Sequence, residues 1–293
     1  MTMRILRARI MGMCFGVQRA IALARDLARG EEITVLGELV HNRAVNAWLE
    51  AQGVHAATNL VEVRTRTVLV SAHGASARLR ARAAAAGHRV ADATCPLVRR
   101  AQDAVKAFAR AGFHPVVVGV PGHAEVRALT EDLLEFDVVA SVEDVEHLVE
   151  NPRLGVVAQT TRPVERLEEV AAAVRRRFPR SLVRVADTVC RATRERQEAA
   201  REIARISDAV VVVGDPASNN TREMAGVCRA LCPRVHRVEG PDEILTEGME
   251  GVETAGLTAG ASTPADIVDA VEKRIWECGM MPKEVLESAS RRV

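Results

Sequence analysis

The sequence predicts an α/β protein built on parallel sheets. Short apolar segments rich in Val, Ile and Ala alternate with longer segments that are rich in Ala, Arg, Glu and Leu and have a helical period. A repeated strand–helix–strand order implies strands that run parallel, with helices packed against the sheet. A length of 293 residues with 48% hydrophobic residues is sufficient for two or three lobes, each with its own core.

The predicted strands are short, and the segments that follow them are longer and amphipathic. The nine predicted strands cover residues 4–10, 33–39, 68–72, 89–93, 115–120, 154–158, 183–186, 209–214 and 255–258. The eight predicted helices cover residues 15–29, 42–52, 76–87, 97–112, 163–178, 191–206, 220–232 and 264–278.

Polar or reactive side chains stand at the ends of most predicted strands. In open parallel α/β sheets, ligands bind beyond the carboxyl ends of the strands, so several of these side chains are expected to share one site. The alternative for any single Ser or Thr among them is that it caps the next helix. The residues at the strand ends are His41, His73, Cys95, His123, Thr160, Cys190, Ser218 and Ser262.

Charge and composition exclude several classes of function. The net charge of +1 and the aromatic content of 2% argue against a nucleic-acid-binding surface. No apolar run approaches the roughly 20 residues of a membrane span, and the N-terminal residues lack the apolar core of a signal peptide. We therefore expect a soluble, cytoplasmic protein that binds neither membranes nor nucleic acids. In that compartment its six cysteines are candidates for metal binding or catalysis, because structural disulfides are rare there.

Three cysteines occupy equivalent positions in the predicted pattern. Cys14, Cys95 and Cys190 each follow a strand-like segment and precede a helix, and the last two share the local pattern Val-Ala-Asp-x-x-Cys. Three thiolates brought together can hold a 4Fe–4S cluster and leave one iron without a protein ligand. The alternative is that they are three buried apolar cysteines, because spacing alone does not distinguish the two. Core packing is predicted for the other three, which are Cys228, Cys232 and Cys278.

The order of short motifs adds a family resemblance. The chain resembles the 4-hydroxy-3-methylbut-2-enyl diphosphate reductases, the LytB/IspH family, over nearly its whole length. Each motif alone is weak, but nine in the right order, including all three candidate cysteines, are specific. They are Gly12-Met13-Cys14-Phe15-Gly16-Val17, Gly37-Glu38-Leu39-Val40-His41-Asn42, Ser71-Ala72-His73-Gly74, Asp92-Ala93-Thr94-Cys95-Pro96-Leu97-Val98, Gly122-His123-Ala124-Glu125-Val126, Gln159-Thr160-Thr161, Asp187-Thr188-Val189-Cys190, Ser218-Asn219-Asn220-Thr221 and Thr258-Ala259-Gly260-Ala261-Ser262-Thr263-Pro264.

The resemblance implies three α/β lobes in a pseudo-threefold arrangement around a central cluster. The implied lobes are 14–95, 96–190, and 1–13 together with 191–293. By resemblance the chain holds one 4Fe–4S cluster through Cys14, Cys95 and Cys190, and one iron has no protein ligand. Glu125 is then the proton donor. The implied substrate-binding residues are His41, His73, His123, Thr160, Ser218, Asn219, Asn220 and Ser262.

The implied reaction is the reductive dehydroxylation of (E)-4-hydroxy-3-methylbut-2-enyl diphosphate to isopentenyl and dimethylallyl diphosphate, the last step of the non-mevalonate isoprenoid pathway. The residue types suit it, because His, Ser, Thr and Asn donate the hydrogen bonds that a diphosphate accepts. Helix N-termini after Asn220 and Pro264 would add backbone N–H groups. Two electrons are needed, and the resemblance implies that reduced ferredoxin or flavodoxin delivers them.

The chain departs from the family pattern at a few positions, chiefly Arg191, Ala124 and Arg127, where Tyr, Pro and a nearby Gly are usual. None of these departures removes a residue with a predicted role. Two other interpretations stay open. One is a different three-cysteine 4Fe–4S enzyme, similar to quinolinate synthase or to diphthamide-synthesis proteins. The other is a divergent paralogue in which the cluster acts as a redox or iron sensor.

Overall fold

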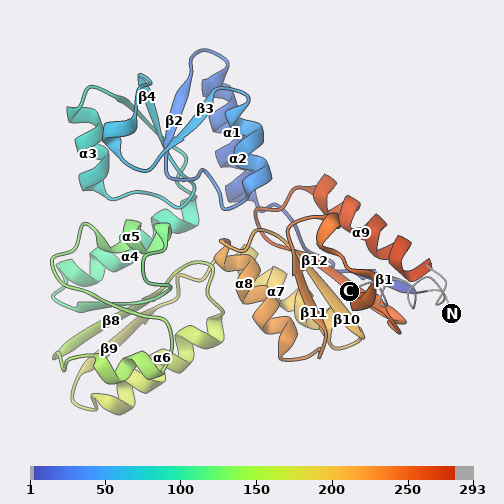
Figure 1. Ribbon diagram of the computed structural model, residues 1–293. Coiled ribbons are helices and arrows are strands. Elements are labelled where there is room, and N and C mark those ends of the chain that lie inside the picture. The colour runs from blue at the N-terminus through green and yellow to red at the C-terminus, as the bar shows by residue number, and fades with distance from the viewer. Residues whose placement is uncertain (1–2, 281–293) are drawn as a thin grey trace. The chain divides into compact units, whose positions relative to one another are not determined.

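The computed structural model describes residues 3–280 and contains three four-stranded sheets in which every neighbouring pair of strands is parallel. Helices lie against all three sheets (Figure 1), so the predicted α/β class is confirmed. The helices are α1 (Phe15–Ala28), α2 (Arg43–Glu50), α3 (Ala77–Ala85), α4 (Pro96–Arg110), α5 (Ala124–Thr130), α6 (Val164–Arg177), α7 (Arg191–Ala204), α8 (Asn219–Arg229) and α9 (Ala265–Met280). Short 3₁₀ helices are η1 (Leu60–Glu62), η2 (Glu143–His147), η3 (Pro241–Glu243) and η4 (Thr246–Met249).

The chain divides into two compact units. The larger unit, Phe15–Arg191, contains two sheets, and the smaller unit combines Met1–Cys14 with Ala192–Val293 around the third sheet. The first sheet has the order β3-β2-β4-β5, from β2 (Ile33–Leu36), β3 (Val54–Ala57), β4 (Thr67–Val70) and β5 (Arg89–Asp92). The second has the order β7-β6-β8-β9, from β6 (His114–Val118), β7 (Asp137–Val139), β8 (Arg153–Ala158) and β9 (Leu182–Ala186). The third has the order β1-β12-β10-β11, from β1 (Arg4–Arg7), β10 (Ala209–Val213), β11 (Val235–Val238) and β12 (Thr254–Ala259).

One topology is used three times. In each sheet the chain forms a central strand, then the edge strand beside it, then crosses back to the strand on the other side and ends at the opposite edge. In the third sheet this last strand is β1, which comes from the start of the chain. A backbone hydrogen bond repeats as well. In each sheet a Gly follows the first of the two central strands (β2, β6 or β10), and its N–H donates to the carbonyl of the last residue of the adjacent edge strand. The pairs are Gly37 and Ala57, Gly119 and Val139, and Gly214 and Val238.

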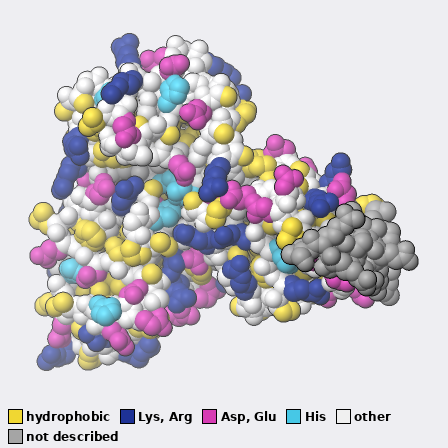
Figure 2. Space-filling model, in the orientation of Figure 1, with side chains coloured by type: hydrophobic (Ala, Val, Ile, Leu, Met, Phe, Trp, Pro, Cys, Tyr) yellow, Lys and Arg dark blue, Asp and Glu magenta, His cyan; other side chains and the backbone are white. Residues whose placement is uncertain are grey.

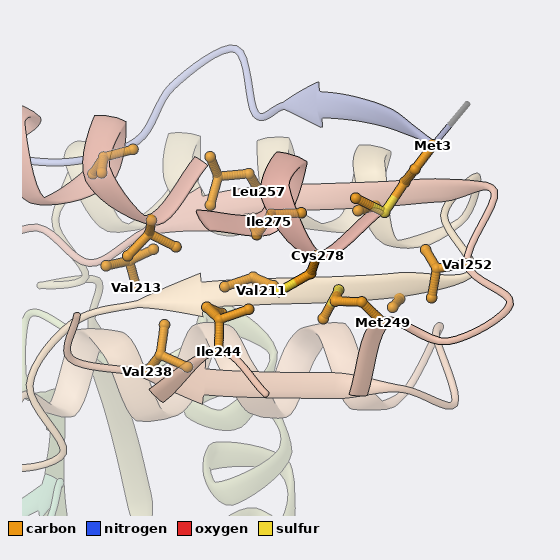
Figure 3. Packing of buried hydrophobic residues seen from close by; sticks show 14 of the residues in the cluster. Met3, Val211, Val213, Val238, Ile244, Met249, Val252, Leu257, Ile275 and Cys278 are labelled. Carbon is orange, nitrogen blue, oxygen red and sulfur yellow. The ribbon is translucent and has the colours of Figure 1, made fainter. Parts of the chain in front are cut away.

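The core of the smaller unit explains why its central strand is so apolar. All five residues of β10 are fully buried, because helices cover both faces of the sheet. Val211 and Val213 pack with Leu257 and with Ile275 of α9 (Figure 3), whereas Val210 and Val212 face α7 and α8. Burial of each such side chain contributes roughly 1.5–3 kcal/mol.

The three cysteines that were predicted to be structural lie in the core. Cys278 points into the cluster of apolar side chains shown in Figure 3, and Cys228 and Cys232 are buried between α7, α8 and β10. Burial raises the pKa of Cys228 to about 12, and the neighbouring Cys232 adds to this rise. The Cys228 thiol therefore stays neutral, and all three buried cysteines pack as small apolar groups.

The first turn of α8 is packed tightly against the strand ends of the smaller unit. A Cβ atom added to Gly260 would lie 2.2 Å from Oγ1 of Thr221, and one added to Gly214 would lie 2.6 Å from the same atom. Gly214 also has a φ of +147°, which side chains rarely adopt. Glycine at both positions lets α8 begin directly above the ends of β10 and β12.

Replacing Gly260 by Ala is expected to destabilise the protein by about 1–3 kcal/mol, because Thr221 has no space to move away. Gly226→Ala is the matched control, since a Cβ atom there meets nothing within 4 Å. That control removes a glycine from a helix interior and should stabilise by roughly 0.5–1 kcal/mol. Urea unfolding of both variants checks this, and equal stability of Gly260→Ala and the parent would contradict the packing argument.

The described surface carries charges of both signs. Lys and Arg are interspersed with Asp and Glu on the visible face of each unit (Figure 2), in keeping with the net charge of +1. Within residues 3–280, none of the helices combines the length and the hydropathy that a membrane span requires.

Candidate functional site

Cys14, Cys95 and Cys190 occupy the same place in the three repeats of the topology. Each comes after the last strand of its sheet and stands directly before a helix, namely α1, α4 or α7. Each backbone N–H also donates to the carbonyl that lies two residues beyond the neighbouring strand. These bonds are 2.9 Å to Ala261, 3.1 Å to Ala72 and 2.9 Å to Thr160, respectively. The three residues are thus presented in the same way, at helix N-termini where backbone N–H groups favour a negatively charged atom.

The chemistry of these three cysteines fits ligation of an iron–sulfur cluster. Each side chain is partly exposed, in contrast to the buried Cys228, Cys232 and Cys278. Thiolates are the ligands that hold such clusters. Cys14 belongs to the smaller unit, and the other two belong to the larger unit. No group of three His, Cys, Asp or Glu side chains arranged to hold a metal ion occurs among the residues that the structure describes.

Three histidines of the larger unit lie against one another. The ring of His41 stacks on that of His73 with centroids 4.2 Å apart, and the ring of His123 lies 5.0 Å from His41 and 5.6 Å from His73. Burial lowers the pKa of His73 well below its usual value, and the neighbouring His41 and His123 add to this effect. His73 is therefore neutral at pH 7, and its buried Nδ1 atom makes no hydrogen bond to the described residues. A neutral imidazole of this kind can donate a hydrogen bond to a ligand.

Glu125 is a buried carboxyl beside these histidines. One oxygen, Oε1, accepts a hydrogen bond of 2.6 Å from the backbone N–H of Thr160, and Oε2 accepts one of 3.0 Å from the Thr160 hydroxyl. Burial raises the pKa of Glu125 to about 7, although the Thr160 hydrogen bonds and the neighbouring His41 oppose this rise. A carboxyl with a pKa near neutrality can give up or take a proton under physiological conditions, as a general acid must.

Helix α5, which the sequence did not predict, positions His123 and Glu125. His123 is its N-cap, and the ring nitrogen Nδ1 accepts the backbone N–H of Glu125 at 3.0 Å. The helix has only seven residues, and buried Val126 and Leu129 anchor it to the core of the second sheet. This N-cap bond holds the imidazole of His123 against the first turn of the helix that carries Glu125.

The polar residues of the smaller unit gather at the start of α8 and the end of β12. Ser218 is the N-cap of α8, and Asn219, Asn220 and Ser262 are buried. Oδ1 of Asn220 accepts the backbone N–H of Ala261 at 2.9 Å, and its buried Nδ2 makes no hydrogen bond to the described residues. The peptide groups of Ala261 thus connect Asn220 with Cys14, whose N–H is bonded to the Ala261 carbonyl.

A buried arginine that was not predicted holds the loop before Cys14. Arg196 of α7 is 6% exposed, and its Nε and Nη2 donate to the carbonyl of Gly12 at 3.0 and 2.8 Å. Its Nη1 donates to the carbonyl of Ala192 at 3.1 Å. Arg191, the departure that follows Cys190, is exposed.

A pocket of about 420 Å³ opens beside the histidines of the larger unit. Its lining includes His41, His73 and Ala124, the exposed residues Arg78 and Arg127, and two glutamates. The structure therefore brings together the predicted residues of the larger unit, namely His41, His73, His123, Glu125 and Thr160. The other histidines lie apart from this group. His55 and His114 contact carboxylates, His88 contacts a backbone carbonyl, His147 is exposed, and His236 is partly buried against Gly248.

Comparison with known proteins agrees with these arrangements. Residues 5–276 match the family model described as "LytB protein". The chain is 41% identical over 276 residues to the 4-hydroxy-3-methylbut-2-enyl diphosphate reductase of Citrifermentans bemidjiense, which covers 93% of this chain and 97% of that protein. It is 40% identical over 279 residues to the protein with the same name from Pelobacter propionicus, covering 94% and 98%.

Two solved structures are similar along most of the chain. One is the E-1-hydroxy-2-methyl-but-2-enyl-4-diphosphate reductase of Plasmodium falciparum, with a TM-score of 0.88, 25% identity, and coverage of 93% of this chain and 88% of that one. The other is an (E)-4-hydroxy-3-methyl-but-2-enyl diphosphate reductase, described as the terminal enzyme of the non-mevalonate pathway. It has a TM-score of 0.66, 32% identity, and coverage of 94% and 100%. Sequence motifs, repeated topology and relatives along the full length lead to one conclusion, which is that the chain belongs to the LytB family.

Proposed function

We propose that this protein is an iron–sulfur oxidoreductase that converts (E)-4-hydroxy-3-methylbut-2-enyl diphosphate to isopentenyl and dimethylallyl diphosphate, the last step of the non-mevalonate isoprenoid pathway. The observation that carries the proposal is the buried Glu125, with a pKa raised to about 7, beside three clustered histidines in a chain whose relatives bear this name. The reaction consumes two electrons and two protons. The C4–O bond breaks, water leaves, and a C–H bond forms at either end of the allyl group.

The chain's own residues have distinct proposed roles. Glu125 holds the proton that the departing hydroxyl takes up, and Thr160 orients its carboxyl through two hydrogen bonds. The neutral His73, with His41 and His123, donates hydrogen bonds to the substrate oxygens. Ser218, Asn219, Asn220 and Ser262 complete the set of diphosphate donors, which is supported by the unused Nδ2 of Asn220 and by the N-terminus of α8.

Cys14, Cys95 and Cys190 are the proposed ligands of a 4Fe–4S cluster, one per chain, in which one iron has no protein ligand. The chemistry that a bound cluster supplies is one-electron transfer, together with an iron that can accept a substrate oxygen. This proposal is supported by the identical presentation of the three cysteines at helix N-termini. The proposed lobes are 14–95, 96–190, and 1–13 with 191–293, and each contributes one strand-end cysteine in the repeated topology. Reduced ferredoxin or flavodoxin is the proposed electron donor.

An anaerobic assay tests the function. The reconstituted protein, a chemical one-electron reductant and the allylic alcohol diphosphate should yield the two five-carbon diphosphates, which are identified by mass spectrometry and NMR. Protein without the reductant is the control. Binding of the substrate without conversion would favour the redox or iron sensor and overturn the enzymatic proposal.

A further inference from the structure

One helix, α4, connects the two groups of residues that line the pocket of the larger unit. It begins directly after Cys95 and packs against α5 and against β6 and β8 of the second sheet (Figure 1). The pocket residue His73 lies in the loop after β4 of the first sheet, whereas the pocket residues Ala124, Arg127 and Ala128 belong to α5, which packs on the second sheet. Helix α5 also carries Glu125 and has His123 as its N-cap. The geometry of the pocket therefore depends on how firmly this loop and α5 are held together.

Gln102, in the middle of α4, is hydrogen-bonded both to the His73 loop and to α5. Its side chain is 3% exposed, and its Nε2 donates to the carbonyl of Ala75 at 3.0 Å and to the carbonyl of Ala128 at 2.9 Å. Both carbonyls are acceptors, so the Gln102 amide must direct its NH₂ group, and not its oxygen, toward Ala75 and Ala128. Ala75 lies two residues after His73, and Ala128 lies three residues after Glu125. One amide group thus joins the two segments that carry the imidazole and the carboxyl.

The bond to α5 also replaces one that the helix cannot make for itself. The last four carbonyls of an α-helix have no partner within it, and Ala128 belongs to this last turn of the seven-residue α5. The donor from Gln102 satisfies this buried carbonyl. Loss of the donor would leave two carbonyls to find other partners, which requires the loop, the helix or both to move.

A second connection lies one helical turn farther along α4. Nζ of Lys106 lies 2.7 Å from Oδ2 of Asp132, and the Asp132 carboxylate accepts the backbone N–H groups of Ala77 and Arg78 at 2.7 and 3.1 Å. These N–H groups belong to the first turn of α3, which follows the His73 loop. Burial would raise the pKa of Asp132, but the hydrogen bonds from Lys106, Ala77 and Arg78 outweigh it and hold the pKa low. The carboxylate therefore stays charged and keeps its bonds at neutral pH.

We infer that Gln102 is a positioning residue of this site, which fixes the His73 loop relative to α5 and so sets the distance between His73 and Glu125. The inference rests on the proposed function for the roles of His73 and Glu125. The hydrogen bonds of Gln102 are independent of that proposal. Gln102 has no access to substrate itself, since its side chain is buried and its donors are both used. Its effect on turnover is transmitted through the two segments that it joins.

The test is Gln102→Met, which keeps the length of the side chain and removes both donors. With the reconstituted protein we expect kcat to fall about 10- to 100-fold, the range that a misplacement of roughly 1 Å causes, while KM changes less than about threefold. Gln52→Met is the matched control, because Gln52 is exposed, follows the end of α2, and its side chain donates to the nearby carbonyl of Trp48 at 3.0 Å. It should leave kcat and KM unchanged.

Hydrogen–deuterium exchange of the same proteins gives a readout that does not need turnover. Gln102→Met should exchange faster than the parent in two segments only, residues 73–78 and 124–132, and Gln52→Met in neither. If Gln102→Met does not fold, Gln102→Asn, which keeps the amide but is one methylene too short to reach both carbonyls, replaces it. Parent-like kcat in the folded variant with unchanged exchange would overturn the inference and leave the proposed function intact. An inactive parent would reject the proposed function, and the exchange result alone would then decide whether Gln102 joins the two segments.

Discussion

Replacing Glu125 by Gln is expected to lower kcat by about 10²- to 10⁴-fold, the contribution typical of a positioned general acid. Gln has the same shape, and its Oε1 can still accept the backbone N–H of Thr160, so the site should keep its geometry. It lacks the acidic proton, however, and departure of the hydroxyl as water requires one. Cluster content and substrate affinity should stay near those of the parent, as measured by iron analysis and by substrate titration. Parent-like turnover of this variant would remove Glu125 from the mechanism.

The pH dependence of the parent gives a second readout of the same residue. Because the pKa of Glu125 is raised to about 7, the protonated fraction is high at pH 6 and low at pH 8. If the carboxyl donates the proton, kcat falls as pH rises through about 7. The residual activity of Glu125→Gln should lack this limb of the profile. A parent profile that is flat between pH 6 and 8 would assign the proton to another group.

The same substitution should also stabilise the protein at alkaline pH. The pKa of this carboxyl is 4.5 in its ordinary state and about 7 in the fold, so the folded state holds the proton more tightly and stability falls as pH rises between these values. A difference of this size corresponds to about 3 kcal/mol above pH 7. Gln carries no such penalty. Urea unfolding should show a clearly larger advantage of Glu125→Gln at pH 8 than at pH 5, because most of the loss occurs between these two pH values.

Cys95→Ser is expected to lose most of the iron–sulfur cluster, because an alcohol replaces one of three thiolate ligands and binds iron far less well. Iron and sulfide analysis with visible absorption after anaerobic reconstitution measures the loss. The matched control is Cys232→Ser, since that thiol is buried in the core and lies 3.4 Å from the carbonyls of both Ser207 and Arg234, which a hydroxyl can use as acceptors. The control should bind as much iron as the parent. A Cys95→Ser variant with a spectroscopically intact cluster would refute the proposed ligand role.

The strands that the sequence did not predict are informative about why prediction fails. They are β3, β7 and β11, and all three occupy the same edge position in the repeated topology. Each has only three or four residues and contains His, Asp or Arg among its apolar residues, so none forms an apolar run. They are strands because a central strand offers its free edge to them. The neighbouring central strand, and not the local sequence, determines that these segments become strands, which is common in β-structure.

The site residues were predictable to the extent that their chemistry is carried by residue type and position along the chain. The histidines and cysteines follow strands, and parallel strands end at a common edge. Gln102 and Arg196 could not be predicted in this way, because they act on backbone carbonyls that are 26 or more residues away. Every residue has a backbone carbonyl, so residue types do not indicate which carbonyl will accept such a bond. Helix α5 was missed for a related reason, since seven residues are too few for a clear helical period.

The origin of β1 has a consequence for the order of events during synthesis. Among the strands that the structure describes, β1 pairs with β12 alone, and Cys14 bonds to the carbonyl of Ala261, so both partners come late in the sequence. While the ribosome is still translating, the first strand has no sheet to join, whereas the two sheets of the larger unit consist of segments that emerge in succession. The Cys14 loop can therefore take its final form only after Ala261 has been synthesised. Cys95 and Cys190 bond instead to the carbonyls of Ala72 and Thr160, which precede them in the chain, so Cys14 is the last of the three cysteines to be fixed in place.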